Sequence, residues 1–183
     1  MTRAVFLDRD GVLNKAIVKD GKPFSPYSVA EMQIVEDAAE ALGRLRRSGF
    51  RLIVTTNQPD IARRKLAPEQ LDAMHDHLRK HMPIDAVEVC PHDGPDHCGC
   101  RKPAPGMLVR AAARDGIVLA DSFMVGDRWR DIEAGQQAGC RTVLIGEGYG
   151  EAFPSRPDAV FASLTDAVAW ILAQPSRGRR PSK

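Results

Sequence analysis

Two aspartates separated by one residue follow the first apolar run of the chain. Asp8 and Asp10 come directly after Ala4–Leu7, and this run predicts a buried strand. Because side chains at i and i+2 of a strand point to the same side, both carboxylates should emerge together at its carboxyl end. Crowded carboxylates repel each other unless a cation or a shared proton relieves them, and Gly11 lets the backbone turn sharply beyond them. The pair therefore indicates a reactive or cation-binding site, with an ordinary turn of two solvated aspartates as the alternative.

Further polar residues stand where later strands are predicted to end. Carboxylate oxygens suit Mg²⁺, and a lysine ammonium or a threonine hydroxyl can hold the oxygens of a phosphoryl group. Of two neighbouring aspartates, one could act as nucleophile and the other as general acid and base. Each residue alone could equally be a turn former, a surface side chain or a helix cap. Together they predict a phosphate site made of Asp8, Asp10, Thr56, Asn57, Lys102, Asp127 and Arg128, with Asp131 one helical turn after Asp127.

Three of the four cysteines lie between positions 90 and 100, next to a histidine. Thiolate sulfur and imidazole nitrogen together favour tetrahedral Zn²⁺. Cys90, His92, Cys98 and Cys100 would fill all four positions, so the predicted zinc is structural and fixes a loop that lacks regular structure. His97 is an alternative nitrogen ligand, and three unrelated reduced thiols are the alternative to a metal site.

Several basic segments have more than one interpretation. The run Arg63-Arg64-Lys65 is interpreted as an exposed helix face; if it pointed into the cleft it could bind a second phosphate. His75 lies in a charge-rich helical segment, which predicts a solvated or capping role. Residues 175–183 hold four basic residues and no acid, the composition of a disordered, solubilising end that could also contact an anionic surface. Cys140 is predicted to be a core thiol.

Strand and helix signals alternate along the chain, and this alternation predicts the fold class. It favours a Rossmann-like three-layer α/β/α sandwich with a mostly parallel sheet and no large cap domain. Two irregular segments, 15–30 and 90–105, both follow predicted strand ends and should crowd the same face. The predicted strands are 4–7, 51–55, 86–89, 122–125, 142–145 and 159–161. The predicted helices are 38–47, 68–81, 105–115, about 130–139 and about 165–173.

Length and composition bound the function. The 183 residues predict one domain over 1–174, which includes the zinc loop at 90–100, followed by the basic tail 175–183. The net charge of +2 is too small to indicate a nucleic-acid partner by itself. The sequence shows no signal peptide and no stretch near the roughly 20 apolar residues needed to span a bilayer. We therefore expect a cytoplasmic protein with reduced cysteines and no membrane partner, and a monomer by default.

The order of the polar motifs resembles the four signature motifs of the haloacid dehalogenase (HAD) superfamily. The motifs are Asp8-x-Asp10-Gly11, Thr56-Asn57, Lys102 and Gly126-Asp127, and the resemblance covers roughly residues 3–172. It implies that Asp8 is a nucleophile that forms an aspartyl-phosphate and that Asp10 is the general acid and base. It also implies that Thr56 and Lys102 hold the phosphoryl group, and that Mg²⁺ contacts Asp8, the Asp10 carbonyl and Asp127.

The zinc loop and the run Asp8–Asn14 are similar to two branches of subclass IIIA of this superfamily. These are the heptose 1,7-bisphosphate 7-phosphatases and the histidinol-phosphate phosphatases. The short gap between His92 and Cys98 is more like the histidinol branch, whereas the segment around Gly126 and the stand-alone length favour the heptose branch. The resemblance places Asn57, Arg101 and Arg128 at the substrate. Pro59-Asp60, Arg64 and the segment 22–28 depart from both branches, and these positions lie near the expected substrate entrance.

The sequence thus predicts a Mg²⁺-dependent phosphomonoesterase with a structural zinc that acts on a small phosphorylated substrate, with a heptose bisphosphate favoured. Histidinol phosphate and a nucleic-acid 3′-phosphate are the alternative substrates. The alternative outside enzymes is a phosphorylatable signalling module. Such receivers place the reactive aspartate at the end of a later strand, and here no aspartate ends the strand 51–55.

Overall fold

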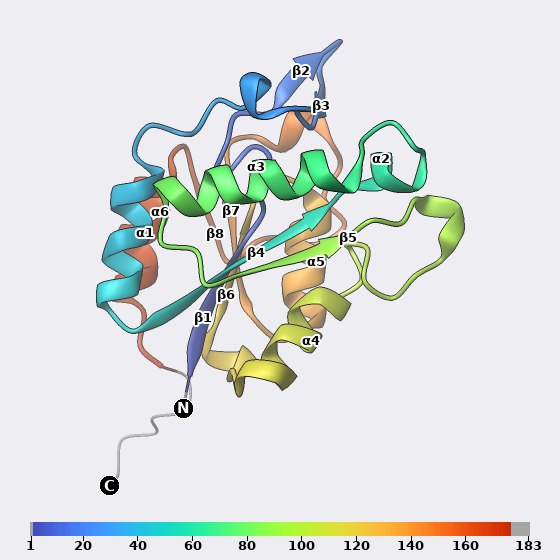
Figure 1. Cartoon of the computed structure of the whole chain (residues 1–183). Helices are drawn as coiled ribbons and strands as arrows, with labels where there is room; N and C mark the ends of the chain where they lie inside the picture. Colours follow the sequence, from blue (N-terminus) through green and yellow to red (C-terminus); the bar gives the residue numbers. More distant parts are fainter. Residues whose placement is uncertain (1, 177–183) are drawn as a thin grey trace, which may run out of the picture.

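The computed structural model describes residues 2–176, and its centre is a six-stranded parallel sheet (Figure 1). All neighbouring pairs in this sheet run parallel, so the predicted fold class is confirmed. The strands, in spatial order, are β5 (Ala86–Cys90), β4 (Phe50–Asn57), β1 (Arg3–Leu7), β6 (Phe123–Gly126), β7 (Arg141–Ile145) and β8 (Ala159–Phe161).

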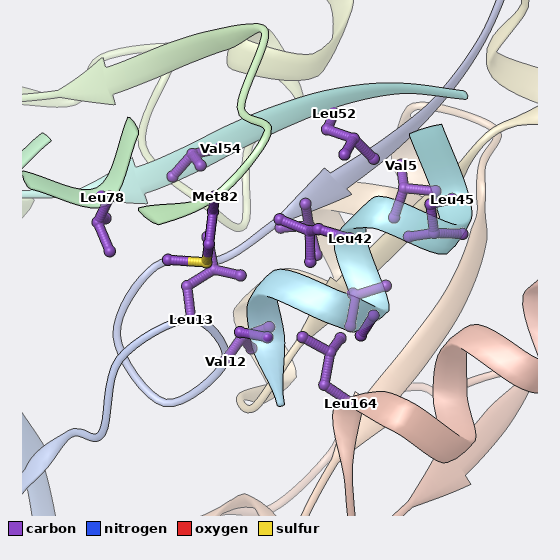
Figure 2. Packing of buried hydrophobic residues seen from close by; sticks show 14 of the residues in the cluster. Val5, Val12, Leu13, Leu42, Leu45, Leu52, Val54, Leu78, Met82 and Leu164 are labelled. Carbon is purple, nitrogen blue, oxygen red and sulfur yellow. The ribbon is translucent and has the colours of Figure 1, made fainter. Parts of the chain in front are cut away.

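Helices cover both faces of the sheet and complete three layers. The helices α1 (Ala38–Arg47), α3 (Pro68–His81) and α6 (Leu164–Ala173) pack on one face; α4 (Gly106–Asp115) and α5 (Trp129–Gln137) pack on the other. Alternate residues of β1 supply the two separate cores, because successive side chains of a strand point to opposite faces. Val5 and Leu7 enter the first core and Ala4 and Phe6 the second. Figure 2 shows Val5 and Leu52 of the sheet beside Leu42 and Leu45 of α1.

The order of the strands explains where a site can form. The chain proceeds outward from β1 through β4 to β5, then returns to the other side of β1 with β6 and continues to β8. The direction of winding therefore reverses beside β1, and open α/β sheets bind ligands at the carboxyl ends of the strands at such a reversal. The predicted site residues lie at or just after the ends of β1, β4 and β6, or in the loop after β5.

The segment 15–30 differs from its prediction as an irregular loop. It contains a short hairpin formed by β2 (Ile17–Lys19) and β3 (Lys22–Phe24). Asp20 and Gly21 both have positive φ, which a tight two-residue hairpin turn requires. An Asp-Gly pair is a recognised hairpin signal, so the sequence contained the information. In Figure 1 this hairpin projects at the end of the sheet where the strands finish.

The structure also bears on several smaller predictions made from the sequence. Arg63 and Arg64 follow a short, unpredicted helix α2 (Pro59–Ala62), and a positive φ at Arg64 breaks any continuation, so the predicted helix face is wrong. His75 is only 3% exposed, so the solvated or capping role is wrong, whereas Cys140 is buried as predicted. Within residues 2–176, no helix has the length and apolarity needed to cross a membrane. The predicted basic tail falls mainly on residues 177–183, outside the described part of the chain.

Candidate active site

A polar cavity of about 220 Å³ opens at the carboxyl ends of β1, β4 and β6. The hairpin residues Pro23, Phe24 and Ser25 form part of its wall. The structure therefore brings together residues that are spread between positions 8 and 131 of the chain. All eight residues predicted to be catalytic or to contact substrate or Mg²⁺ line this cavity: Asp8, Asp10, Thr56, Asn57, Arg101, Lys102, Asp127 and Arg128.

Lys102 lies at the centre of a buried charge cluster. Its ammonium donates to Asp8 Oδ1 at 2.8 Å, to Asp131 Oδ1 at 2.5 Å and to the carbonyl of Thr55 at 2.8 Å. Burial lowers the pKa of Lys102, but the Asp131 and Asp8 carboxylates raise it more, so the ammonium stays charged. Burial raises the pKa of Asp8, Lys102 lowers it, and Asp131 and Asp10 raise it, so the net pKa is about 7. A fixed cation thus stands beside the carboxylate predicted to attack phosphorus.

Asp127 fits a metal ligand. It is 3% exposed, and its Oδ1 is buried without a hydrogen-bond partner in the described structure, while Tyr149 donates to its Oδ2 at 2.8 Å. Burial, then the charges of Asp8 and Asp131, raises the pKa of Asp127 to about 8. Ligand oxygens of Asp8, Asp127 and Asp131 lie within 4.8 Å of one another. Such a cluster of hard oxygens with an unsatisfied carboxylate atom has the chemistry of a Mg²⁺ site.

Gly11 allows the loop after β1 to approach Asp127. Its φ is +93°, and a Cβ built at this position would lie 1.7 Å from Asp127 Oδ2. Only glycine therefore satisfies both the backbone conformation and the space. The turn that follows the aspartate pair is thereby fitted against the carboxylate that follows β6.

The Asp10 carboxylate is held by four side chains. Arg9 donates to Oδ1 at 2.9 Å and to Oδ2 at 2.8 Å, and the other three donors are Asn14 at 2.9 Å, Ser25 at 2.8 Å and Gln58 at 3.1 Å. Burial raises the pKa of Asp10, but the Arg9 guanidinium and these hydrogen bonds lower it more, so the net pKa lies below its ordinary value. The contacts with Arg9 and the neutral donors thus favour the ionised form of the Asp10 carboxylate.

The residues at and just after the end of β4 link Asp10 to the rest of the site. Gln58 donates to both Asp10 Oδ2 and, at 2.8 Å, Thr56 Oγ1, so the Thr56 hydroxyl proton remains available for a phosphoryl oxygen. The Asn57 side chain accepts from the Lys102 amide and donates to the Lys102 carbonyl, each at 3.0 Å. Asn57, which was predicted to contact substrate, lines the cavity, and its amide also positions the lysine.

Two arginines at the mouth of the cavity are paired with carboxylates. Arg63 makes two bonds to Asp93, at 2.6 and 2.7 Å, and a longer one to Asp60 at 3.3 Å. Asp60 in turn accepts from the Tyr27 hydroxyl at 3.0 Å. These contacts connect the segment after the hairpin, α2 and the cysteine loop around the opening. Arg128, predicted to bind substrate, is paired with Glu151.

The four predicted zinc ligands converge on one point. The Sγ atoms of Cys90, Cys98 and Cys100 are 3.3 to 3.6 Å apart, and His92 Nδ1 lies 3.7 Å from Cys90 Sγ and 3.3 Å from Cys100 Sγ. Tetrahedral zinc with Zn–S bonds of about 2.3 Å separates two sulfurs by about 3.8 Å. The donor set is therefore close to the geometry that zinc requires, and His97 is not part of it.

Sequence reasoning missed several residues that complete the site. Arg9 is fully buried, and its Nη1 also lies 3.5 Å from His75 Nε2. Burial is the largest cause that lowers the pKa of His75, and with the charges of Arg9 and Arg79 it brings this pKa to about 4. No local pattern marks Arg9, because an arginine between two aspartates is expected to be exposed. Tyr149 follows β7 in a glycine-rich loop, and its place beyond a strand end was the available signal.

Known proteins resemble this chain in sequence and in structure. A model of the HAD-hydrolase-like family matches residues 99–167. The chain is 36% identical over 184 residues to D-glycero-beta-D-manno-heptose-1,7-bisphosphate 7-phosphatase of Pseudomonas aeruginosa, covering 95% of this chain and 100% of that protein. It is 35% identical over 153 residues to the protein of the same name from Bordetella bronchiseptica, covering 81% and 83%. The crystal structure of the D,D-heptose 1,7-bisphosphate phosphatase from B. bronchiseptica, complexed with magnesium and phosphate, has a TM-score of 0.81 at 32% identity and covers 93% of this chain and 98% of that chain.

Proposed function

The chain belongs to the heptose-1,7-bisphosphate 7-phosphatase family of the HAD superfamily, and we propose that it hydrolyses the 7-phosphate of a D-glycero-D-manno-heptose 1,7-bisphosphate. The resemblance predicted from the motifs is confirmed, and of the two branches the heptose one is supported. The observation that carries the proposal is the buried contact between Asp8 and Lys102 at 2.8 Å in a cavity that Thr56 and Asp127 also line. A nucleophilic carboxylate, a fixed cation and a hydroxyl donor together suit phosphoryl transfer.

In the first step, the Asp8 carboxylate attacks phosphorus as the bond to the sugar oxygen breaks. The protonated form of Asp10 gives its proton to that leaving oxygen, so the sugar departs as an alcohol and Asp8 carries the phosphoryl group. The pKa of Asp10 lies below its ordinary value in the free protein. A phosphate group bound nearby brings negative charge, which raises that pKa and favours the protonated form. Lys102 and Thr56 hold the phosphoryl oxygens throughout.

In the second step, water attacks the phosphorus of the aspartyl-phosphate. The Asp10 carboxylate accepts a proton from this water, and the bond between phosphorus and the Asp8 oxygen breaks to release inorganic phosphate and the free carboxylate. Asp10 is ionised at this stage, because it gave its proton to the leaving oxygen in the first step. Gln58 and Ser25 hold its Oδ2 at 3.1 and 2.8 Å on the cavity wall.

Asp8, Asp127 and the Asp10 carbonyl would hold Mg²⁺, and the unpartnered Asp127 Oδ1 supports this assignment. When bound, Mg²⁺ neutralises the negative charge of the carboxylates and the phosphoryl oxygens. Asp131 lies in the same cluster, but its Oδ1 is 2.5 Å from Lys102. Its main role is therefore to position the lysine.

Zinc at Cys90, His92, Cys98 and Cys100 would have a structural role. The loop between β5 and α4, residues 91–105, contains one short 3-10 turn and carries Arg101 and Lys102 after its last cysteine. A filled tetrahedral site leaves no open position for chemistry, so the metal would fix the loop that delivers the lysine. The proximity of the four donor atoms supports this proposal.

A substrate panel tests the proposed function. Phosphate release is measured from heptose 1,7-bisphosphate, histidinol phosphate and a 3′-phosphorylated oligonucleotide, with and without Mg²⁺. We expect Mg²⁺-dependent turnover of the heptose bisphosphate and its loss in Asp8→Asn, with Asp76→Asn on the exposed surface of α3 as the matched control. Turnover of only one of the other two substrates, or equal turnover by Asp8→Asn, contradicts the proposal.

A further inference from the structure

Five basic side chains line the cavity, and they differ in how their charge is balanced. Lys102 contacts Asp8 and Asp131, Arg63 is paired with Asp60 and Asp93, and Arg128 is paired with Glu151. Among residues 2–176, no carboxylate forms an ion pair with Arg101 or Arg130. Arg101 donates only to the His92 carbonyl, at 3.2 Å, and Arg130 lies over the Trp129 ring at 5.0 Å.

Arg130 occupies an unfavourable position for a cation. It stands in the first turn of α5, where the helix dipole favours negative charge. Its guanidinium is partly buried, and burial is the largest cause that lowers its pKa. The like charges of Arg128 and Arg101 lower the pKa as well. Glu151 and Asp131 raise it, but the net pKa lies below its ordinary value. An anion bound beside Arg130 would stabilise its charge electrostatically. The helix N-terminus and the two guanidiniums then attract the same ligand.

Arg101 and Arg130 also mark the place where two cavities meet. Both residues, with Lys102, line the cavity at the aspartates and a second one that extends along the cysteine loop past Asp93 and His97. The first cavity, at about 220 Å³, is smaller than the roughly 300–1,000 Å³ of pockets that enclose whole small-molecule ligands. A sugar with phosphates at both ends therefore extends beyond the first cavity.

We propose that the phosphate group that is not hydrolysed binds between Arg101 and Arg130, and that Arg130 is a specificity-determining residue for bisphosphorylated substrates. This inference rests on the proposed function and deepens it. Arg63 is less suitable for this phosphate, because Asp60 and Asp93 already neutralise its charge. The remote phosphate would neutralise the charges of Arg101 and Arg130, which form no ion pair with a carboxylate among residues 2–176.

The test compares two substrates of the same sugar that differ only in the remote phosphate. The kcat/KM values for heptose 1,7-bisphosphate and heptose 7-phosphate are measured for the natural protein and for Arg130→Gln. Because a charge-assisted contact to phosphate is lost, we expect a fall of roughly ten- to 100-fold for the bisphosphate, mainly in KM. The value for the monophosphate should stay within about twofold, since that substrate never makes the contact.

Three further variants separate this role from a general defect. Arg130→Lys keeps the charge without the planar fork and should recover part of the loss. Arg63→Gln should change kcat/KM for the two substrates by the same factor. Arg79→Gln, on the exposed surface of α3, should change kcat/KM for neither substrate. Binding of the bisphosphate to Asp8→Asn, with and without Arg130→Gln, measured by calorimetry, shows whether the loss is one of affinity.

The outcomes distinguish the two proposals. The inference is wrong while the function stands if the natural protein hydrolyses the bisphosphate but Arg130→Gln lowers kcat/KM equally for both substrates or for neither. If the natural protein hydrolyses neither heptose phosphate, the proposed function is wrong, and the inference falls with it. A circular-dichroism melt of each variant confirms that the comparison is made between folded proteins.

Discussion

Replacing the buried Arg9 by methionine should destabilise the protein through the carboxylate that it leaves behind. Arg9 is fully buried and makes two hydrogen bonds, of 2.8 and 2.9 Å, to Asp10, whose side chain is only 13% exposed. Removing one partner of a buried ion pair costs about 3–5 kcal/mol, because the other charge remains without compensation. Asn14, Ser25 and Gln58 still donate to Asp10, so we expect a value near the lower end, about 3 kcal/mol.

The loss should depend on pH. In the natural protein the pKa of Asp10 is lowered, so its contribution to stability is present above the unfolded pKa of about 3.9 and is lost as pH falls through the folded value. Without Arg9, burial dominates and the folded pKa rises, so the ionised carboxyl destabilises the variant increasingly as pH rises. The stability difference between the two proteins should therefore widen from about pH 4 to pH 7.

The assay is urea unfolding of both proteins at about pH 5 and pH 7. With a urea slope of about 2 kcal/mol/M, a loss of 3 kcal/mol moves the midpoint by about 1.5 M. Adding Asp10→Asn to Arg9→Met removes the unpaired charge and should restore part of the stability and abolish the extra pH dependence. Arg79→Met, which breaks an exposed pair with Asp76, is the matched control and should cost less than about 1 kcal/mol. A loss below about 1 kcal/mol for Arg9→Met, or one unaffected by Asp10→Asn, would refute the reasoning.

Three other changes have defined outcomes. Asp8→Asn should lower turnover of the heptose bisphosphate by more than about 10³-fold at unchanged melting temperature, because the amide cannot form the phosphoryl ester; retained turnover would contradict the nucleophile assignment. Cys98→Ser combined with Cys100→Ser should abolish bound zinc by metal analysis and expose the loop to proteolysis; zinc that persists at one per chain would contradict the ligand set. Gly11→Ala should cost about 1–3 kcal/mol in urea and weaken Mg²⁺ binding measured by calorimetry, because the new Cβ would meet Asp127 Oδ2 at 1.7 Å; an unchanged midpoint and affinity would contradict the close approach.

Local pattern was enough to predict the framework of the fold. The apolar run before Asp8 and the one before Asp127 are parts of β1 and β6, buried on both faces as strands of a parallel sheet must be. Helix α3 begins at Pro68 and ends at His81 as predicted, because proline suits the first turn of a helix and a proline soon after its end stops it. These signals act over a few residues, so the sequence carries them directly.

The hairpin at residues 17–24 and the role of Arg63 show where local pattern was insufficient. The Asp20-Gly21 turn was recognisable, but the contact of Ser25 with Asp10 depends on where the hairpin packs. Arg63 is exposed as predicted, but it lies beyond the end of α2 and is paired with Asp60 and Asp93. Long-range placement of this kind depends on how elements pack, and no local spacing encodes it.

The sequence by itself determined which chemistry to expect of the site: the aspartate pair, the lysine and threonine predicted to bind phosphate, and the sulfur and imidazole groups predicted to bind zinc. Residue type and motif order settle those, since each group's reactivity belongs to its own side chain. Only the tertiary structure decided the charge balance. In the folded chain the Asp10 side chain is paired with Arg9, and Asp131 accepts a hydrogen bond from Lys102. Arg101 and Arg130 line the cavity without a carboxylate partner among residues 2–176. Electrostatic energy depends on distance and burial, which exist only after the chain has folded.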